Sequence, residues 1–155
     1  MSFFFLYHLY DIIFLKIGDN MEIIVRKYED TDYEGADKVL FESLSYHKEK
    51  LSDDRVYEFV ASLEGKVVGY FNLMEEVDII RNIKIFHIGY VCVDPECRGQ
   101  GIGRKMMDFA ISYAKENGAA RMELTSSNYR EAAHKLYLSL GFVKRDSSIF
   151  RKELV

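Results

Sequence analysis

Short runs of mostly apolar residues, bounded by polar residues and turns, recur through the first two thirds of the chain and predict β-strands. A run rich in β-branched residues predicts a short strand over 22–27. Residues 56–63 and 66–76 have the same character and are separated by a short turn containing glycine, which predicts a hairpin. A further strand, dense in Ile, Val, Phe and Tyr, is predicted over 84–93, and Pro95 prevents its simple continuation.

Helical periodicity interrupts these strands. Thr31 and Glu34 match a capping box and predict a helix from there to about Tyr46. A second helix is predicted over 101–117, with Gly118 as its C-terminal cap. Its apolar face is formed by residues that recur at every fourth position: Ile102, Met106, Ala110 and Ala114.

The last third of the chain repeats the alternation of strand and helix. A strand is predicted over 120–125 and an amphipathic helix over 129–140, which Gly141 ends. Two short strands over 142–145 and 149–154 are expected to close the sheet as a hairpin. This order of elements favours an α/β (α+β) class, with a mixed sheet flanked by helices.

Residues 1–20 differ from the rest because they are rich in Phe and Tyr and poor in charge. His8 and Asp11 break the apolar run, which falls short of the roughly 20 residues needed to span a bilayer. A basic n-region and a small-residue cleavage site, the marks of a secretory signal, are missing. The segment is interpreted as an extension upstream of a true start at Met21, or as an accessory segment packed on the domain or a partner. A single domain is predicted over 21–155.

Composition narrows the function classes. The 155 residues are 48% hydrophobic and 30% charged, which suits one globular domain. A net charge of −4 disfavours a sequence-independent grip on nucleic acid, and no membrane partner is expected. Two cysteines do not make a disulfide scaffold and fit a reducing cytoplasm, so a cytoplasmic location is predicted.

Three glycines lie between the strand ending at residue 93 and the following helix. Gly99, Gly101 and Gly103 let the backbone turn sharply and bring the amides of a helix N-terminus close to a ligand, which is an arrangement suited to phosphate. Arg98 and Arg104 add positive charge. The dinucleotide and P-loop fingerprints both fail, because Arg104 stands where each needs glycine. The pattern that fits is R-x-x-G-x-G.

With these motifs the chain resembles the GNAT acyltransferases (GCN5-related N-acetyltransferases) over residues 21–155. The glycine turn resembles the family's acyl-CoA pyrophosphate loop. Ala133–Tyr137 followed by Gly141-Phe142 resembles the family's A-x-x-x-Y…G-F ending. Residues 122–128 are similar to the strand that precedes it in N-terminal acetyltransferases.

The resemblance implies a GNAT-type, mostly antiparallel sheet with a splayed acyl-CoA groove between the strand ending at Val93 and the strand 120–125. The pantetheine arm of acetyl-CoA is implied to pair with backbone groups of Val91, Cys92 and Val93. The diphosphate is implied to bind the turn that comprises Arg98, Gly99, Gln100, Gly101, Ile102, Gly103 and Arg104.

The implied reaction is attack of an amine on the acetyl thioester. Tyr137 holds the family's position for the general acid that protonates the leaving thiolate, although it is also a candidate core residue. Glu123 and His87 each match a position where relatives carry a base, and a water chain is a third option. On a strand of regular period two, His87 shares one face with Gly89, Val91 and Val93, which places it beside the groove.

Two further positions leave alternatives open. Asn128 matches a cofactor-contacting Asn of the family, but it lies nine residues before Tyr137 rather than the seven of many relatives. It is either a cofactor ligand or the N-cap of a helix beginning at Tyr129, and a later helix start leaves Arg130 nearer the cofactor. The acidic cluster Glu75, Glu76 and Asp78 is either a solvated hairpin end or a collar for a cationic amine.

No metal is expected. His87, Cys92 and Cys97 lie five residues apart, so neighbouring members point to opposite faces of a strand and do not converge.

The sequence therefore predicts an acetyl-CoA-dependent N-acetyltransferase that acts by direct transfer to a primary amine. The acceptor is a protein N-terminus, a lysine, a polyamine or another small amine, framed by the loops 44–55 and 77–83. The alternative is a non-catalytic acyl-CoA-binding or sensor module. Because dimers are common in the family, a homodimer to which the N-terminal segment contributes is also considered.

Overall fold

The computed structural model describes residues 12–17, 21–50 and 53–154. They fall into two compact units that divide between Thr125 and Ser126. Each unit is described by itself. In the described part of the chain, no helix has the length and apolar character required to cross a membrane.

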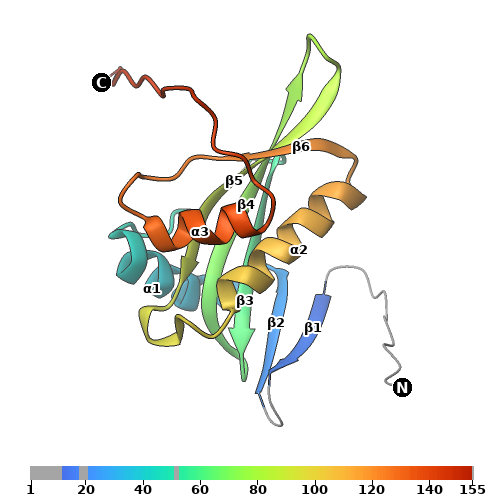
Figure 1. The fold of residues 1–155 in the computed structure, drawn as a ribbon. Helices are drawn as coiled ribbons and strands as arrows, with labels where there is room; N and C mark the ends of the chain where they lie inside the picture. The colour runs from blue at the N-terminus through green and yellow to red at the C-terminus, as the bar shows by residue number, and fades with distance from the viewer. Residues whose placement is uncertain (1–11, 18–20, 51–52, 155) are drawn as a thin grey trace. The chain divides into compact units, whose positions relative to one another are not determined.

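The first unit is built on a six-stranded sheet (Figure 1). Its strands lie in chain order: β1 (Ile12–Ile17), β2 (Met21–Lys27), β3 (Val56–Leu63), β4 (Lys66–Asp78), β5 (Ile83–Val93) and β6 (Ala119–Leu124). All neighbours are antiparallel except β5 and β6, which are parallel. The predicted mixed, mostly antiparallel sheet is confirmed.

The N-terminal segment contributes one element that sequence reasoning did not place. Ile12–Ile17 pairs with β2 along its length and forms the edge strand of the sheet. Residues 1–11 and 18–20 of this segment lie outside the described residues. The interpretation of 1–20 as an extension, and of Met21 as the start, stays a prediction.

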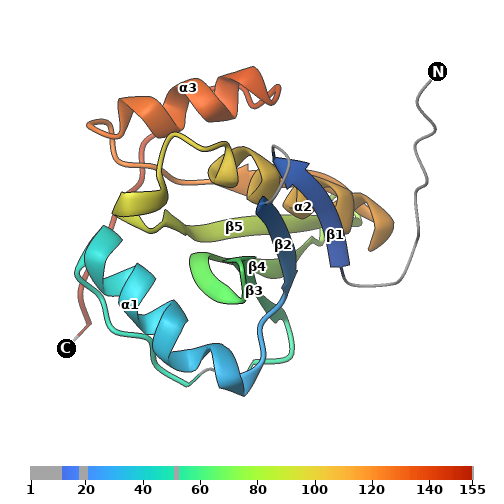
Figure 2. The ribbon, with the colours of Figure 1, turned by 90° about the horizontal axis from the view of Figure 1, so that it is seen from below.

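Two helices lie on opposite faces of the sheet (Figure 2): α1 (Tyr33–Leu44) and α2 (Ile102–Glu116). A 3-10 turn, η1 (Asp30–Asp32), leads into α1. The predicted capping box at Thr31 and Glu34 is wrong, because the box forms two residues earlier between Glu29 and Asp32. Asp32 is buried, and its two carboxylate oxygens also accept charge-assisted hydrogen bonds from Arg26, at 2.7 and 2.8 Å.

The alternation of side chains along the strands separates two packed layers. On the α2 face, the Phe59 ring lies 4.9–5.3 Å from the rings of Phe71, Phe109 and Tyr113. On the α1 face, a smaller buried cluster joins helix and sheet: Ala36, Val39, Leu40, Val60, Tyr70 and Cys92. The core on both faces is therefore contributed mainly by β3, β4 and β5.

A β-bulge in β5 changes which residues share a face. Asn72 lies opposite Gly89, but Tyr70 lies opposite Cys92, so β5 has one extra residue there, and Tyr90 has a φ of +50°. After the bulge the alternation is inverted. Val93 pairs with Gly69, whose Cα faces Met106 of α2, whereas His87 precedes the bulge and lies on the α1 face.

The prediction that His87, Gly89, Val91 and Val93 share one face is therefore wrong. It assumed a regular period of two through the whole strand, and the extra residue at Tyr90 breaks that period.

The second unit contains α3 (Glu131–Ser139) and an extended tail. The helix begins two residues later than predicted, after a turn in which Arg130 N–H donates to Ser127 O at 3.0 Å. The predicted closing strands over 142–145 and 149–154 are wrong, because residues 142–154 contain no strand. Their apolar side chains, Val143, Ile149, Phe150 and Leu154, are exposed. Strands this short are stable only when an adjacent strand pairs with them, which a local pattern does not determine.

Candidate active site

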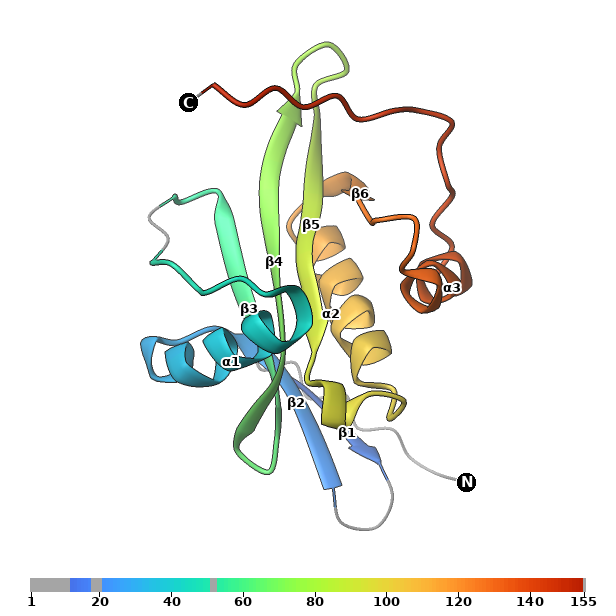
Figure 3. The same ribbon diagram turned by 90° about the vertical axis from the view of Figure 1, so that its left-hand side faces the viewer.

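The strand β5 is longer than its parallel neighbour β6. Their parallel ladder runs from Lys84–Ala119 to Ile88–Leu124, but β5 continues to Val93 (Figure 3). The bulge at Tyr90 lies just beyond the last pair. The second half of β5 therefore extends past the end of β6, and the predicted splay would begin there.

The glycine turn follows directly at the end of β5. Asp94 is buried and organises it: its backbone N–H donates to Val68 O, and its Oδ1 accepts from Glu96 N–H at 3.0 Å. Gly99 and Gly101 both have φ of +78°, a conformation that favours glycine, and Gly101 is the N-cap of α2. Ile102 is buried and anchors the first turn of the helix. The N-terminal amides of α2 are therefore presented behind a glycine turn, as an anion site requires.

The two arginines of the motif make different contacts. Arg98 Nε donates to Val93 O at 3.1 Å and Nη2 donates to Ser43 Oγ at 3.3 Å, which ties the turn to the end of α1. Arg104 lies one turn before Asp108 on α2, and its Nε is 3.8 Å from Asp108 Oδ2. Arg98 thus holds the end of β5 in place in addition to carrying charge near the turn.

The two candidate bases lie side by side. His87 on β5 is directly opposite Glu123 on the parallel strand β6. His87 Nε2 is 2.7 Å from Glu76 Oε2, and Glu123 Oε1 accepts from Arg121 Nη1 at 3.3 Å. The two candidate bases and their partners, Glu76 and Arg121, each keep between 32% and 56% of their side-chain surface exposed. They can therefore be reached from solvent.

The hairpin carboxylates divide between the two faces. Glu76 pairs with His87, whereas Glu75 lies 3.1 Å from Lys84 and accepts the Tyr57 hydroxyl. Asp78 accepts from Arg81 at the hairpin end. The predicted acidic cluster is therefore three separate ion pairs rather than a single collar.

The remaining predicted site residues lie in the second unit. Asn128 is in the turn before α3, and Arg130 is the N-cap, so the alternative of Asn128 as N-cap is wrong. Within this unit the Tyr137 ring lies 6.1 Å from that of Phe142, and Phe142 N–H donates to Tyr137 O. The roles of Tyr137 and Asn128 remain predictions.

The two cysteines, neither of which is expected to bind a metal, lie in different parts of the fold. Cys92 is buried in the α1-face cluster, whereas Cys97 is in the 3-10 turn η2 (Pro95–Cys97). Within the described ranges no three His, Cys, Asp or Glu side chains are grouped to hold a metal ion.

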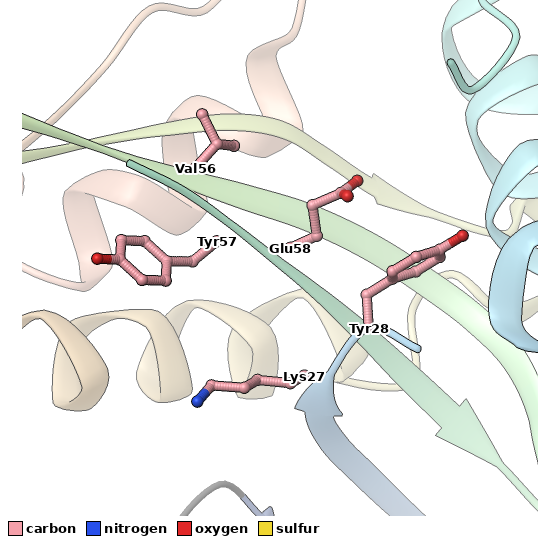
Figure 4. A pocket seen from close by; sticks show the side chains of 5 residues that line it. All are labelled: Lys27, Tyr28, Val56, Tyr57 and Glu58. Carbon is pink, nitrogen blue, oxygen red and sulfur yellow. The ribbon is translucent and has the colours of Figure 1, made fainter. Parts of the chain in front are cut away.

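Sequence reasoning missed a buried polar cluster on the α1 face. Glu58 accepts the hydroxyl of Tyr70 and the ammonium of Lys48, the latter at 2.6 Å. Burial, reinforced by the Glu58 charge, raises the pKa of both Tyr70 and Tyr28. Figure 4 shows Tyr28, after the end of β2, and Glu58 on β3 lining a pocket of about 190 Å³ together with Lys27. A lysine in a polar loop is usually solvated, so the sequence offered no signal for this cluster.

Comparison with known proteins identifies the family to which this fold belongs. Residues 19–142 match the model of the acetyltransferase (GNAT) family. The chain belongs to the GNAT family. The match contains every residue proposed above for cofactor or catalysis, and it ends where the tail without strands begins.

The relatives of this GNAT chain are N-acetyltransferases. It is 35% identical to human N-acetyltransferase 8B over 59% of its length, and 31% identical over 83% of its length to an uncharacterized N-acetyltransferase of Archaeoglobus fulgidus. The chain spans 40% of the length of the human relative and 90% of that of the archaeal one. Among solved structures, an aminoglycoside N-acetyltransferase in complex with CoA has a TM-score of 0.76 at 16% identity, covering 90% of this chain and all of that one.

Proposed function

We propose that this GNAT chain is an acetyl-CoA-dependent N-acetyltransferase that transfers an acetyl group directly to a primary amine. The observation that carries the proposal is that the second half of β5, which extends past the end of β6, leads directly from Val93 into the glycine turn that opens α2. A pantetheine arm extended along β5 would therefore lead directly to the glycine turn, which is proposed to hold the diphosphate.

The glycine turn is proposed to hold the diphosphate of acetyl-CoA. Backbone amides from Gly99 to Arg104 lie at the positive end of the α2 dipole, and the positive φ of Gly99 and Gly101 brings them together without a Cβ in between. The pantetheine arm is expected along Val91, Cys92 and Val93 in the manner of an added strand.

Proton removal from the acceptor is the main chemical demand. A lysine amine with a pKa near 10.4 is neutral in about one molecule in 2,500 at pH 7, whereas about one α-amine in ten is neutral. His87 is the proposed base, because the Glu76 carboxylate can orient its ring and stabilise the imidazolium that forms. Glu123, opposite His87, is the second candidate, and a water between them is the third.

Tyr137 is proposed as the acid that protonates the departing CoA thiolate, by its place in the family motif. Because a thiol with a pKa near 8.5 already leaves readily, Tyr137→Phe is expected to lower kcat by no more than about 10²–10⁴-fold.

The test is CoA release, followed with a thiol-reactive dye. The acceptor panel holds a polyamine, an aminoglycoside, a lysine peptide and peptides with free N-termini. Tyr137→Phe is compared with Tyr129→Phe, which removes the hydroxyl of an exposed tyrosine in the same unit. Release with one acceptor, lowered only in Tyr137→Phe, supports both the activity and the acid.

The same experiment decides the alternative of a non-catalytic sensor. Acetyl-CoA binding without release for any acceptor would favour the sensor, and absence of binding would refute the acyl-CoA site. A cytoplasmic location and a homodimer stay predictions from the sequence.

A further inference from the structure

The side chain of Lys48 is buried as an ion in a cage of one carboxylate and two aromatic rings. Its side chain is only 4% exposed. The ammonium lies 2.6 Å from Glu58 Oε1, 4.5 Å from the Tyr28 ring centre and 5.7 Å from that of Tyr70. A carboxylate beside aromatic faces is the chemistry by which proteins bind an alkylammonium group.

Lys48 enters this cage from a loop without regular structure rather than from the sheet. Its backbone N–H donates to Asp37 Oδ1 at 2.6 Å, and its carbonyl accepts the Tyr33 hydroxyl at 2.9 Å. The cage borders a pocket of about 360 Å³ lined by Tyr28, Asp30, Tyr33, Lys48, Lys50 and Glu58. The cage walls, Tyr28, Glu58 and Tyr70, therefore belong to the sheet and its margin, whereas the cation that fills the cage belongs to a separate loop.

The cage is connected across the sheet to the site of acetyl transfer. Glu58 lies opposite Asn72 on β4, and Asn72 lies opposite Gly89 on β5, next to the last β5–β6 pair. Asn72 covers Gly89 so closely that a Cβ there would lie 2.6 Å from Asn72 Oδ1. Two strand spacings separate the cage from the opening of the splay, which is about 10 Å.

We propose that Tyr28, Glu58 and Tyr70 form an ammonium site of the acceptor pocket, which Lys48 occupies as a tethered ligand until a cationic acceptor displaces it. The proposal rests on the proposed function and names its substrate class: a long diamine, with one amine at the splay and a second ammonium in the cage. Acceptors that lack the second charge gain no affinity from this site, because they cannot replace Lys48 in its contact with Glu58.

The ammonium site is tested first, by thermal unfolding without acetyl-CoA. Lys48→Ala leaves the cage without its cation, and propylammonium chloride is expected to restore stability to this variant alone. A dissociation constant near 10 mM would raise its Tm by about 3–5 °C at 100 mM ligand, relative to the same concentration of sodium chloride. Lys66→Ala removes an exposed lysine from the same sheet and should show no such rise.

Two cage variants keep the result interpretable. Lys48→Ala combined with Glu58→Gln should lose the response. Lys48→Ala combined with Tyr28→Leu should lose it too, although this variant keeps the hydrogen bond from Tyr70 to Glu58. If Lys48→Ala is unfolded without ligand, refolding of this variant in propylammonium chloride, but not in sodium chloride, would equally support the ammonium site. A Tm unaffected by propylammonium in Lys48→Ala overturns the proposal.

Acetyl transfer tests the link to the acceptor. Diaminooctane, diaminopropane and octylamine are compared as acceptors, and diaminooctane is expected to be preferred. Lys48→Ala should lower the KM for diaminooctane about tenfold, because it removes the competing ammonium group. The KM for octylamine should change little. Glu58→Gln should abolish the preference of diaminooctane over octylamine.

The outcomes separate this proposal from the proposed function. Equal use of diaminooctane and octylamine by the wild type and Lys48→Ala overturns the acceptor role, even if propylammonium binds. Absence of transfer to every amine overturns the proposed function and with it the acceptor role, whereas the thermal experiment still decides whether the cage binds an ammonium ion.

Discussion

Gly101→Ala separates backbone strain from anion binding at the turn before α2. Gly101 has a φ of +78°, and an added Cβ would meet no atom within 4 Å. The substitution therefore causes no clash within the protein, and its cost is the left-handed conformation alone, about 1–2 kcal/mol. For a chain of this size the Tm should fall by about 2–8 °C.

The effect on acetyl-CoA is expected to be larger than this strain predicts. Relaxing φ at the N-cap turns the first amides of α2 away from the diphosphate, and the loss of one hydrogen bond to a charged group costs about 1.5–3 kcal/mol. The dissociation constant of CoA, measured by titration calorimetry, should rise about ten- to a hundredfold.

Gly65→Ala is the matched control for Gly101→Ala. Gly65 lies in the β3–β4 turn with a φ of +79° and the same open surroundings, so it should lose similar stability. Because Gly65 contributes no amide to the N-terminus of α2, Gly65→Ala should bind CoA as the wild type does. Equal CoA affinities for the two variants would refute an anion site at the α2 N-terminus.

Two further substitutions test the residues around the site. Glu76→Gln retains a hydrogen-bonding group for His87 but removes the negative charge that would stabilise the imidazolium, so kcat/KM with an amine acceptor should fall about tenfold or more. Glu75→Gln, on the other face of the same strand, is the control, and equal rates for the two would exclude the His87–Glu76 pair from proton transfer. Asp32→Asn should lower the free energy of unfolding at pH 7 by about 1.5–3 kcal/mol, because it removes the charge-assisted bonds to Arg26. Burial alone would raise the pKa of Asp32, but the Arg26 hydrogen bonds and the Glu29 N–H bond outweigh it and hold the pKa low. The wild type should therefore keep this stability above about pH 4 and lose it on further acidification, as followed by urea unfolding. Asp54→Asn, at an exposed carboxylate, should not reproduce the loss at pH 7.

Local patterns predicted those parts of the fold that local interactions determine. The β3–β4 hairpin and α2 each carry their own periodicity and turn residues, and both form close to their predicted bounds. The glycine turn is readable for the same reason, since a positive φ at Gly99 and Gly101 is a property of the residues themselves. The sequence therefore located the glycine turn, whereas it did not predict the register of the strands that lead to it.

Features that depend on distant partners were not predictable. The bulge at Tyr90 needs a positive φ at a residue that disfavours it, and the pairing of β4 with β5 imposes it. Lys48 is buried only because Glu58 and Tyr70, both on the sheet, provide its partners. The same limit explains the tail after Gly141, where the apolar residues suggested strands but no adjacent strand pairs with them.

Under the proposed function, the bulge would also determine how acetyl-CoA and the acceptor share one strand. With regular alternation, His87 and Val93 would lie on the same face, and the amine and the pantetheine arm would compete for it. The extra residue at Tyr90 leaves His87 on the α1 face, next to Glu76 and Glu123, and inverts the alternation along the edge that leads to the glycine turn. An acceptor approaching over Asn72 would then meet the thioester at Gly89, where the two halves of β5 join. Deleting Tyr90 should restore the regular period and abolish acetyl transfer at any acceptor concentration; a deletion variant that folds and retains transfer would show that the inverted alternation is not required.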